Sequence, residues 1–93
     1  MYWVYVLINR QAGKRYIGQT EDLQRRISEH NSRSIYNNHH RYTSKLPGKW
    51  QLAYSEEHTT RGEAVKRERW LKSGAGRAWL DSSIGRASQP EAD

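Results

Sequence analysis

An unbroken run of apolar side chains opens the chain, and a more polar run follows it. Residues 3–8 read WVYVLI, and this continuous mixture of β-branched and aromatic residues predicts a strand buried on both faces. Residues 9–13 carry a turn signal that ends in glycine. Residues 14–19 then predict a second strand, so the two strands are expected to pair as an antiparallel hairpin.

Helical periodicity begins directly after this hairpin. Thr20 is a residue type that favours the N-cap position, and Glu21 and Asp22 would place negative charge in the first helical turn. This helix is expected to run to about Asn31. Residues 32–48 show no clear periodicity and predict a polar, basic loop, which at this length is typical of a functional segment.

Strand and helix signals return in the second half of the chain. Within residues 50–54, Trp, Leu and Tyr alternate with other residues, which predicts a strand with one buried face. Thr60 and Glu63 form a capping box that starts a second helix, and the glycines after Ser73 predict its end. Residues 76–84 predict a third, short helix that carries apolar side chains.

These elements define one domain, expected to span residues 1–84. Residues 85–93 lack an apolar pattern and are expected to form a disordered tail. The predicted order is β-β-α-β-α-α. It indicates a mixed α/β fold in which helices flank a small three-stranded antiparallel sheet.

The charge balance adds a class of partner to this picture. Sixteen Lys and Arg residues against ten Asp and Glu give a net charge of +6 and a sequence pI of about 9.9 in 93 residues. This excess favours a polyanionic partner, although a merely soluble basic protein would show it as well. The apolar run at the start is far too short to span a bilayer, so no membrane partner is expected.

Cysteine is absent from the chain. This excludes disulfides, thiolate zinc sites and a cysteine nucleophile. It is also compatible with a reducing compartment, and a cytoplasmic location is expected.

The first helix places polar side chains beside its packing stripe. At about 100° per residue, Leu23 and Ile27 define the apolar stripe, and His30 falls inside it. Arg26 lies about 60° from Leu23, whereas Arg25 points nearly the opposite way. The simplest interpretation is that Arg26 lays its aliphatic stem along the core and extends its charged head into water. The alternative is that Arg26 and His30 belong to a site.

The second helix contains an acid at a position expected to be apolar. Ala64, Glu68 and Leu71 lie at i, i+4 and i+7, so Glu68 occupies the middle of one apolar face. Carboxylates are rarely buried unless they are paired or bind a metal. The sequence therefore leaves two interpretations of equal weight, an ion pair of Glu68 with Arg26 or Lys72, or a functional acid.

The hairpin contributes two tyrosines. Tyr5 and Tyr16 share a sheet face if the numbers of paired residues sum to an odd value, such as 23, which would set Tyr5 opposite Gly18. The turn does not determine this register. Core packing with a satisfied hydroxyl would explain either tyrosine alone, and Gly18 would leave room for a backbone or a phosphate.

Together, these residues resemble the GIY-YIG endonucleases over residues 2–84. The two name-giving elements correspond to VYV at residues 4–6 and YIG at residues 16–18. The spacing from YIG to Thr20, Arg26 and His30 is similar to that of the family. The segment EAVKRERWLK resembles the part of the family that carries its metal-binding glutamate, which falls on Glu68. Two departures are Gln19, where some members have lysine, and the lack of an asparagine after the second helix.

The resemblance implies a catalytic set of Tyr5, Tyr16, Arg26, His30 and Glu68 that converges on the open face of the sheet. Glu68 would hold one Mg²⁺ or Mn²⁺ ion, and Arg26 would brace charge on the phosphoryl oxygens. A tyrosine, with Tyr5 favoured, would take the proton from the attacking water. Its ordinary pKa near 10 is high for a base, so nearby positive charge would have to lower it. Tyr16 and His30 would position the water or assist the transfer.

DNA is the expected partner, with RNA as an alternative substrate. Because no separate DNA-selecting domain is evident, we expect low sequence specificity and a preference for branched, nicked or single-stranded DNA in repair or recombination, or dependence on a protein partner. The protein is expected to be a monomer or a weak homodimer. The residues expected to contact DNA are Gln19, Arg25, His40, Arg41, Tyr42, Lys45 and Lys72.

Two other functions compete with this one. A non-catalytic nucleic-acid-binding module would explain the charge and the aromatic residues, but it does not explain an acid inside the stripe of the second helix. A protein-interaction adaptor would tolerate high salt, whereas DNA binding should weaken steeply as salt rises.

Overall fold

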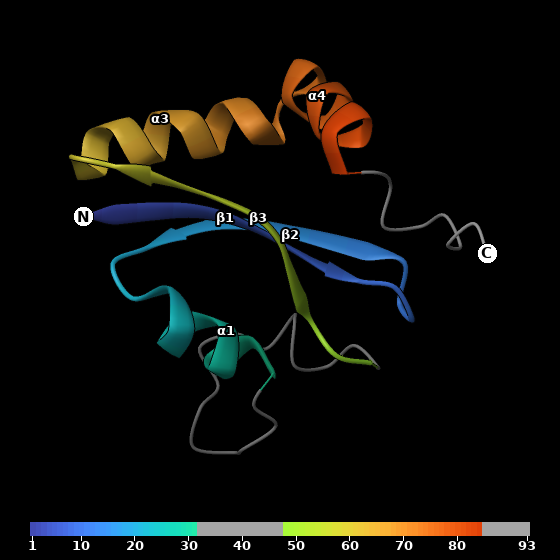
Figure 1. Ribbon diagram of the computed structural model, residues 1–93. Coiled ribbons are helices and arrows are strands. Elements are labelled where there is room, and N and C mark those ends of the chain that lie inside the picture. The colour runs from blue at the N-terminus through green and yellow to red at the C-terminus, as the bar shows by residue number, and fades with distance from the viewer. Residues whose placement is uncertain (32–47, 85–93) are drawn as a thin grey trace.

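The predicted order of elements is confirmed in the computed structural model, which describes residues 1–31 and 48–84. These residues form β1 (Tyr2–Asn9), β2 (Lys14–Thr20), α1 (Leu23–Asn31), β3 (Gln51–His58), α3 (Arg61–Lys72) and α4 (Gly74–Ile84). Figure 1 shows a sheet with α1 on one side and with α3 and α4 on the other. Among the described residues, no helix has both the length and the apolar character needed to cross a membrane. The predicted tail, residues 85–93, lies outside the described residues.

The sheet is antiparallel throughout and has the strand order β2-β1-β3. Because β1 is the central strand and helices lie on both faces, its side chains are buried in both directions. Val4 and Val6 pack toward α3 and α4, whereas Tyr5 and Leu7 pack toward α1. This arrangement confirms that the continuous apolar run forms a strand buried on both faces.

The register of the hairpin is the one that brings the two tyrosines to a common face. Tyr5 pairs with Gly18, and Leu7 pairs with Tyr16, so the paired numbers sum to 23. Tyr5 and Tyr16 therefore both point toward the α1 side of the sheet. The odd register sum, which the turn sequence alone did not determine, is therefore present.

The third strand differs from its predicted form. Its pairing with β1 shifts between Val6 and Leu7, which leaves Ala53 as an extra residue in a bulge. Trp50 packs on the α1 side, whereas Tyr54 packs against the core on the opposite side. The prediction of a strand with one buried face was wrong, because the bulge switches the face on which the later residues lie.

The first helix begins two residues later than its predicted cap suggested. Thr20 is the last residue of β2, and its hydroxyl accepts a hydrogen bond from the Asp22 amide at 3.1 Å. Asp22 caps the helix instead, because its Oδ1 accepts a hydrogen bond from the Arg25 amide at 3.1 Å. The prediction of Thr20 as the N-cap was wrong, since Thr20 still pairs with Trp3 in the sheet.

The second predicted helix has the expected ends. The Thr60 hydroxyl accepts a hydrogen bond from the Glu63 amide at 3.2 Å, and Ser73 is the C-cap. The third helix begins at Gly74, two residues before its predicted start. Gly76 lies so close to the preceding helix that a Cβ atom there would overlap the Trp70 carbonyl, so α4 folds directly back on α3.

Candidate active site

Three rings meet on the α1 side of the sheet. The Tyr5 hydroxyl and His30 Nε2 share a buried hydrogen bond of 2.9 Å. The Tyr16 ring lies over the same imidazole, with centroids 4.5 Å apart, and 6.2 Å separates the centroids of the two tyrosine rings. Tyr5 is 1% exposed and His30 is fully buried, whereas Tyr16 is only partly buried.

Gly18 makes this arrangement sterically possible. A Cβ atom at Gly18 would lie 2.7 Å from the Tyr5 hydroxyl oxygen and 2.9 Å from the carbon that carries it. The Tyr5 ring therefore lies across the β2 backbone at the one position of that strand without a side chain. The space that the sequence suggested for a backbone or a phosphate is occupied by Tyr5.

The end of α1 is held in place by a pair of hydrogen bonds that sequence reasoning missed. The Asn31 side chain accepts from the Trp50 amide at 2.8 Å and donates to the Trp50 carbonyl at 3.1 Å. The Trp50 ring then stands edge-on to Tyr16, with centroids 6.5 Å apart. This contact fixes the helix turn that carries His30. A single asparagine at a helix end gives no distinctive sequence signal for such a role.

The two adjacent arginines of α1 differ as helical spacing predicts. The Arg25 side chain is 68% exposed and that of Arg26 is 34% exposed. Arg26 donates from Nη1 to Glu29 at 3.2 Å, a partner one helical turn away that the sequence analysis did not single out. The positive charge of Arg26 favours the ionised form of Tyr5 and so opposes the rise in the Tyr5 pKa, which places Arg26 near the rings.

The pKa of Tyr5 moves away from the value that a base needs. Burial raises the pKa of Tyr5 well above its usual range, and the neighbouring Tyr16 raises it further. Arg26 opposes this shift in the pKa but does not outweigh burial. The expectation of an open sheet face with a lowered tyrosine pKa was wrong at Tyr5, because α1 covers this residue.

Glu68 lies on α3, on the other side of the sheet from the three rings. Its side chain is 20% exposed, and Oε2 accepts a hydrogen bond from Lys72 Nζ at 2.7 Å. Of the two ion pairs considered from the sequence, the one with Lys72 is present. The Glu68 carboxylate also contributes to the raised pKa of Tyr5, so its charge acts on the buried hydroxyl.

The chemistry of Glu68 is compatible with a hard divalent cation. Within residues 1–31 and 48–84, no three His, Asp or Glu side chains gather into a metal cluster. A single carboxylate is nevertheless a suitable protein ligand for Mg²⁺, which commonly completes its shell with waters and substrate phosphates. Glu68 is the described residue at this site that could hold such an ion.

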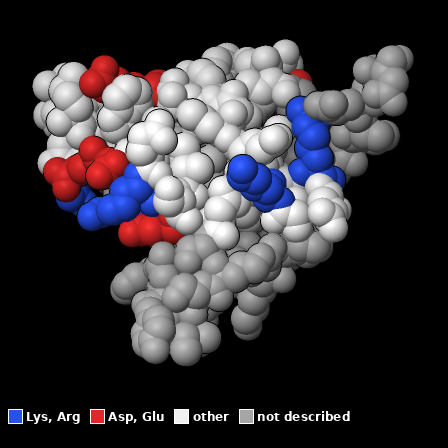
Figure 2. Space-filling model, turned by 60° about the horizontal axis from the view of Figure 1, so that its bottom comes forward, with Lys and Arg blue, Asp and Glu red and all other residues white. Residues whose placement is uncertain are grey.

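The residues expected to contact DNA are partly accounted for. Gln19 and Arg25 line a polar hollow of about 150 Å³ together with Arg26 and with Arg61, which sequence reasoning missed. Lys72 is exposed on α3. Figure 2 shows that basic side chains form separate groups on one face, with acidic side chains beside one of them. Four expected contact residues lie outside the described residues: His40, Arg41, Tyr42 and Lys45.

Comparison with known proteins gives one positive result. A family model described as the GIY-YIG catalytic domain matches residues 1–78 of the 93-residue chain. The match spans both tyrosine strands, α1 and the whole of α3. No curated protein and no solved structure gave a match.

Proposed function

Since the chain belongs to the GIY-YIG catalytic-domain family, whose members are endonucleases that hydrolyse phosphodiester bonds, we propose that it is a metal-dependent DNA endonuclease with low sequence specificity. The observation that carries the proposal is the buried Tyr5–His30 hydrogen bond beside Arg26, with the Glu68 charge within reach. A binding module needs no such coupling of a phenol, an imidazole and a carboxylate.

Tyr5 and His30 act together as the base. Water gives a proton to the Tyr5 oxygen while the Tyr5 proton passes to His30 Nε2, 2.9 Å away. The water oxygen attacks phosphorus, and the bond to the leaving oxygen breaks. Because burial makes a free phenolate costly at Tyr5, transfer to the imidazole is the route that avoids forming one. His30 must then begin as the neutral tautomer that accepts at Nε2.

Arg26 stabilises the charge that grows on the phosphoryl oxygens. Its guanidinium offers a planar fork of donors that suits two phosphate oxygens at once. The hydrogen bond to Glu29 restrains the side chain before substrate arrives, so less rotamer freedom is lost on binding. Tyr16, which is partly exposed above His30, positions the attacking water.

Glu68 holds one Mg²⁺ or Mn²⁺ ion in this proposal. When bound, the ion would polarise the scissile phosphate and stabilise the leaving oxygen. Lys72 neutralises the carboxylate through a 2.7 Å contact, and its exposed ammonium group can exchange this contact for one with a substrate phosphate.

The substrate proposal follows from the surface near the site. Among the described residues, Gln19, Arg25 and Lys72 offer side chains suited to phosphate contacts, which carry no sequence information. We therefore propose branched, nicked or single-stranded DNA as the preferred substrate in repair or recombination, with RNA as an alternative and a protein partner for targeting. A monomer or weak homodimer acting in the cytoplasm completes the proposal.

A cleavage assay with matched acids tests this function. End-labelled duplex, single-stranded, flap and four-way-junction DNA are incubated with Mg²⁺, with Mn²⁺ and with chelator. Glu68→Gln is compared with Glu63→Gln, which changes an exposed acid of the same helix. Metal-dependent cleavage that is lost only in Glu68→Gln supports the proposal. Cleavage that persists in Glu68→Gln contradicts the metal assignment, and salt-sensitive binding without cleavage favours a binding module.

A further inference from the structure

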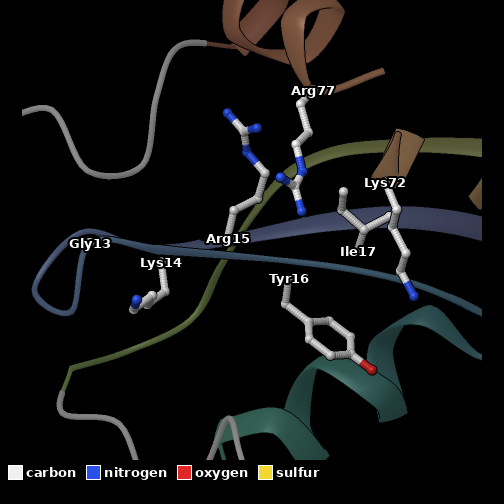
Figure 3. A pocket seen from close by; sticks show the side chains of 7 residues that line it. All are labelled: Gly13, Lys14, Arg15, Tyr16, Ile17, Lys72 and Arg77. Carbon is white, nitrogen blue, oxygen red and sulfur yellow. The ribbon is translucent and has the colours of Figure 1, made fainter. Parts of the chain in front are cut away.

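A cationic groove lies along β2, which is an edge strand among the described strands, next to the proposed site. It has a volume of about 590 Å³, enough for roughly twenty water molecules at ~30 Å³ each, so it is much larger than one phosphate group. Seven residues line it: Gly13, Lys14, Arg15, Tyr16, Ile17, Lys72 and Arg77 (Figure 3). Four of these carry positive charge and none is acidic. We call it the β2-edge groove.

The groove exists because, within residues 1–31 and 48–84, no strand pairs with the outer side of β2. Successive strand residues point to opposite faces, so Arg15 and Tyr16 extend away from each other. Figure 3 shows Arg15 with Arg77 on the α4 side of β2, and the Tyr16 ring on the α1 side. The groove therefore connects the ring cluster with the surface beside α4.

The four cations of the groove have different roles. Arg15 is only 14% exposed and donates to Asp81 at 2.8 Å, so its charge is neutralised and it forms part of the wall. Lys72 contacts Glu68. Lys14 and Arg77 are exposed, and neither forms an ion pair with another described residue. These two side chains can take a new anionic partner without breaking a contact.

We propose that the β2-edge groove binds the phosphodiester backbone of the substrate on one side of the cleavage site, with Lys14 and Arg77 as its phosphate contacts. This inference rests on the proposed nuclease function and adds a path for the strand. The Tyr16 ring lines the groove and packs against Tyr5 and His30, so a strand that passes Tyr16 lies next to these buried rings. Cations that contact phosphates and an aromatic ring on which a base can stack are the features that single-stranded nucleic-acid grooves combine.

The test measures how strongly binding depends on salt. Fluorescently labelled duplex and single-stranded DNA are titrated with wild type, Lys14→Ala, Arg77→Ala and Lys66→Ala, all in chelator. Lys66 is an exposed cation of α3 that lies outside the groove and instead lines a hollow with His58, so it controls for the loss of one charge. Alanine is well tolerated in a helix, and the exposed Arg77 can be replaced without loss of folding.

In the groove variants alone, DNA binding is expected to depend less steeply on salt than in wild type. Each of Lys14→Ala and Arg77→Ala should reduce the slope of log binding constant against log salt by about 0.9 on duplex or about 0.7 on single strands. The form of DNA whose slope falls by the full value expected for that form is the one that occupies the groove. The KM of cleavage should rise and kcat should stay unchanged, because neither residue reaches the scissile phosphate. Slopes equal to that of Lys66→Ala would overturn the inference.

The outcome also separates this inference from the proposed function. Metal-dependent cleavage with no slope change in Lys14→Ala or Arg77→Ala would keep the nuclease and reject the groove. The expected slope changes without cleavage in any metal would keep the groove as a nucleic-acid site and reject hydrolysis. A protein that binds neither form of DNA would reject both.

Discussion

Tyr5 on the central strand and His30 in the last turn of α1 share a buried hydrogen bond of 2.9 Å although 25 positions separate them in the chain. The bond ties the sheet to the helix and gives the Tyr5 hydroxyl group a fixed hydrogen-bond partner. Because burial raises the pKa of Tyr5, this hydroxyl stays protonated at neutral pH unless the proton passes to its partner. Proton movement at Tyr5 therefore depends on His30.

Removing the Tyr5 hydroxyl should abolish most cleavage while preserving the fold. Tyr5→Phe is expected to lower the single-turnover rate by about 10²-fold or more, the usual contribution of a positioned acid or base. The change leaves His30 Nε2 without its partner, at a cost of about 1–3 kcal/mol in the free energy of unfolding. Tyr54→Phe is the matched control, because Tyr54 donates to Glu56 on the opposite face. Equal rates in both variants would contradict the role of Tyr5.

Adding one methyl group at Gly18 should displace the Tyr5 ring. Gly18→Ala places Cβ 2.7 Å from the Tyr5 hydroxyl oxygen, an overpacking expected to cost about 1–3 kcal/mol. Urea unfolding measures the loss. Gly62→Ala is the control, because no atom lies within 4 Å of its Cβ, and it should stabilise α3 by up to about 1 kcal/mol.

A double-mutant cycle identifies the contact responsible. Combining Gly18→Ala with Tyr5→Phe removes the oxygen that the new methyl group meets first, so the two destabilisations should sum to more than the double variant shows. Strict additivity would mean that Gly18→Ala acts elsewhere in the hairpin.

Removing Lys72, the ion-pair partner of Glu68, should strengthen the binding of a divalent metal ion at Glu68. Lys72→Ala removes an ammonium group 2.7 Å from the carboxylate, and the affinity for Mn²⁺ followed by electron paramagnetic resonance should rise about twofold, the scale of an exposed helical ion pair. DNA affinity should fall in the same variant because a phosphate contact is lost. An unchanged Mn²⁺ affinity, equal to that of Lys66→Ala, would argue against Glu68 as the ligand.

Acid should destabilise the protein through Glu56 on the other face of the sheet. Burial alone would raise the pKa of Glu56, but its contacts with Tyr54, His58 and Arg67 outweigh burial and hold the pKa below its usual value. The folded state therefore keeps this carboxylate ionised at pH values where the unfolded chain takes up a proton. Its contribution is fully present above the ordinary pKa of about 4.3 and is lost as pH falls through the folded value.

The Glu56→Gln variant isolates this contribution. Its free energy of unfolding should lie about 1–3 kcal/mol below that of wild type at neutral pH, and the difference should shrink as the solution is acidified. Urea unfolding followed by circular dichroism across this range gives both curves. A difference that stays constant with pH would show that the charge of Glu56 is not the cause.

Regular helical geometry made several site residues predictable from the sequence. A uniform step of about 100° per residue is enough to separate Arg25 from Arg26 and to place His30 inside the packing stripe. The same rule placed Glu68 among apolar neighbours. It could not choose between Arg26 and Lys72 as its partner, because that choice depends on how α3 sits beside the sheet.

The helix cap, the bulge and the groove depend on tertiary contacts, which local sequence patterns do not reveal. Thr20 and Asp22 are both good cap residues, and only the pairing of Thr20 within the sheet decides between them. The bulge at Ala53 follows from how β3 meets β1, which no alternation of side chains reveals. The β2-edge groove likewise combines Lys14 and Arg77 from distant elements, so charge composition indicates cations without locating them.

The Asn31–Trp50 hydrogen bonds have a consequence for how this family member can diversify. They join Asn31 at the end of α1 to Trp50 just before β3. This link holds the ring cluster in place from one side. A connection between clamped ends can change its length at little cost, since each doubling adds only about 0.6 kcal/mol of closure entropy. Asn31 and Trp50 thus keep the end of α1 and the start of β3 in register with each other whatever the length of chain between them.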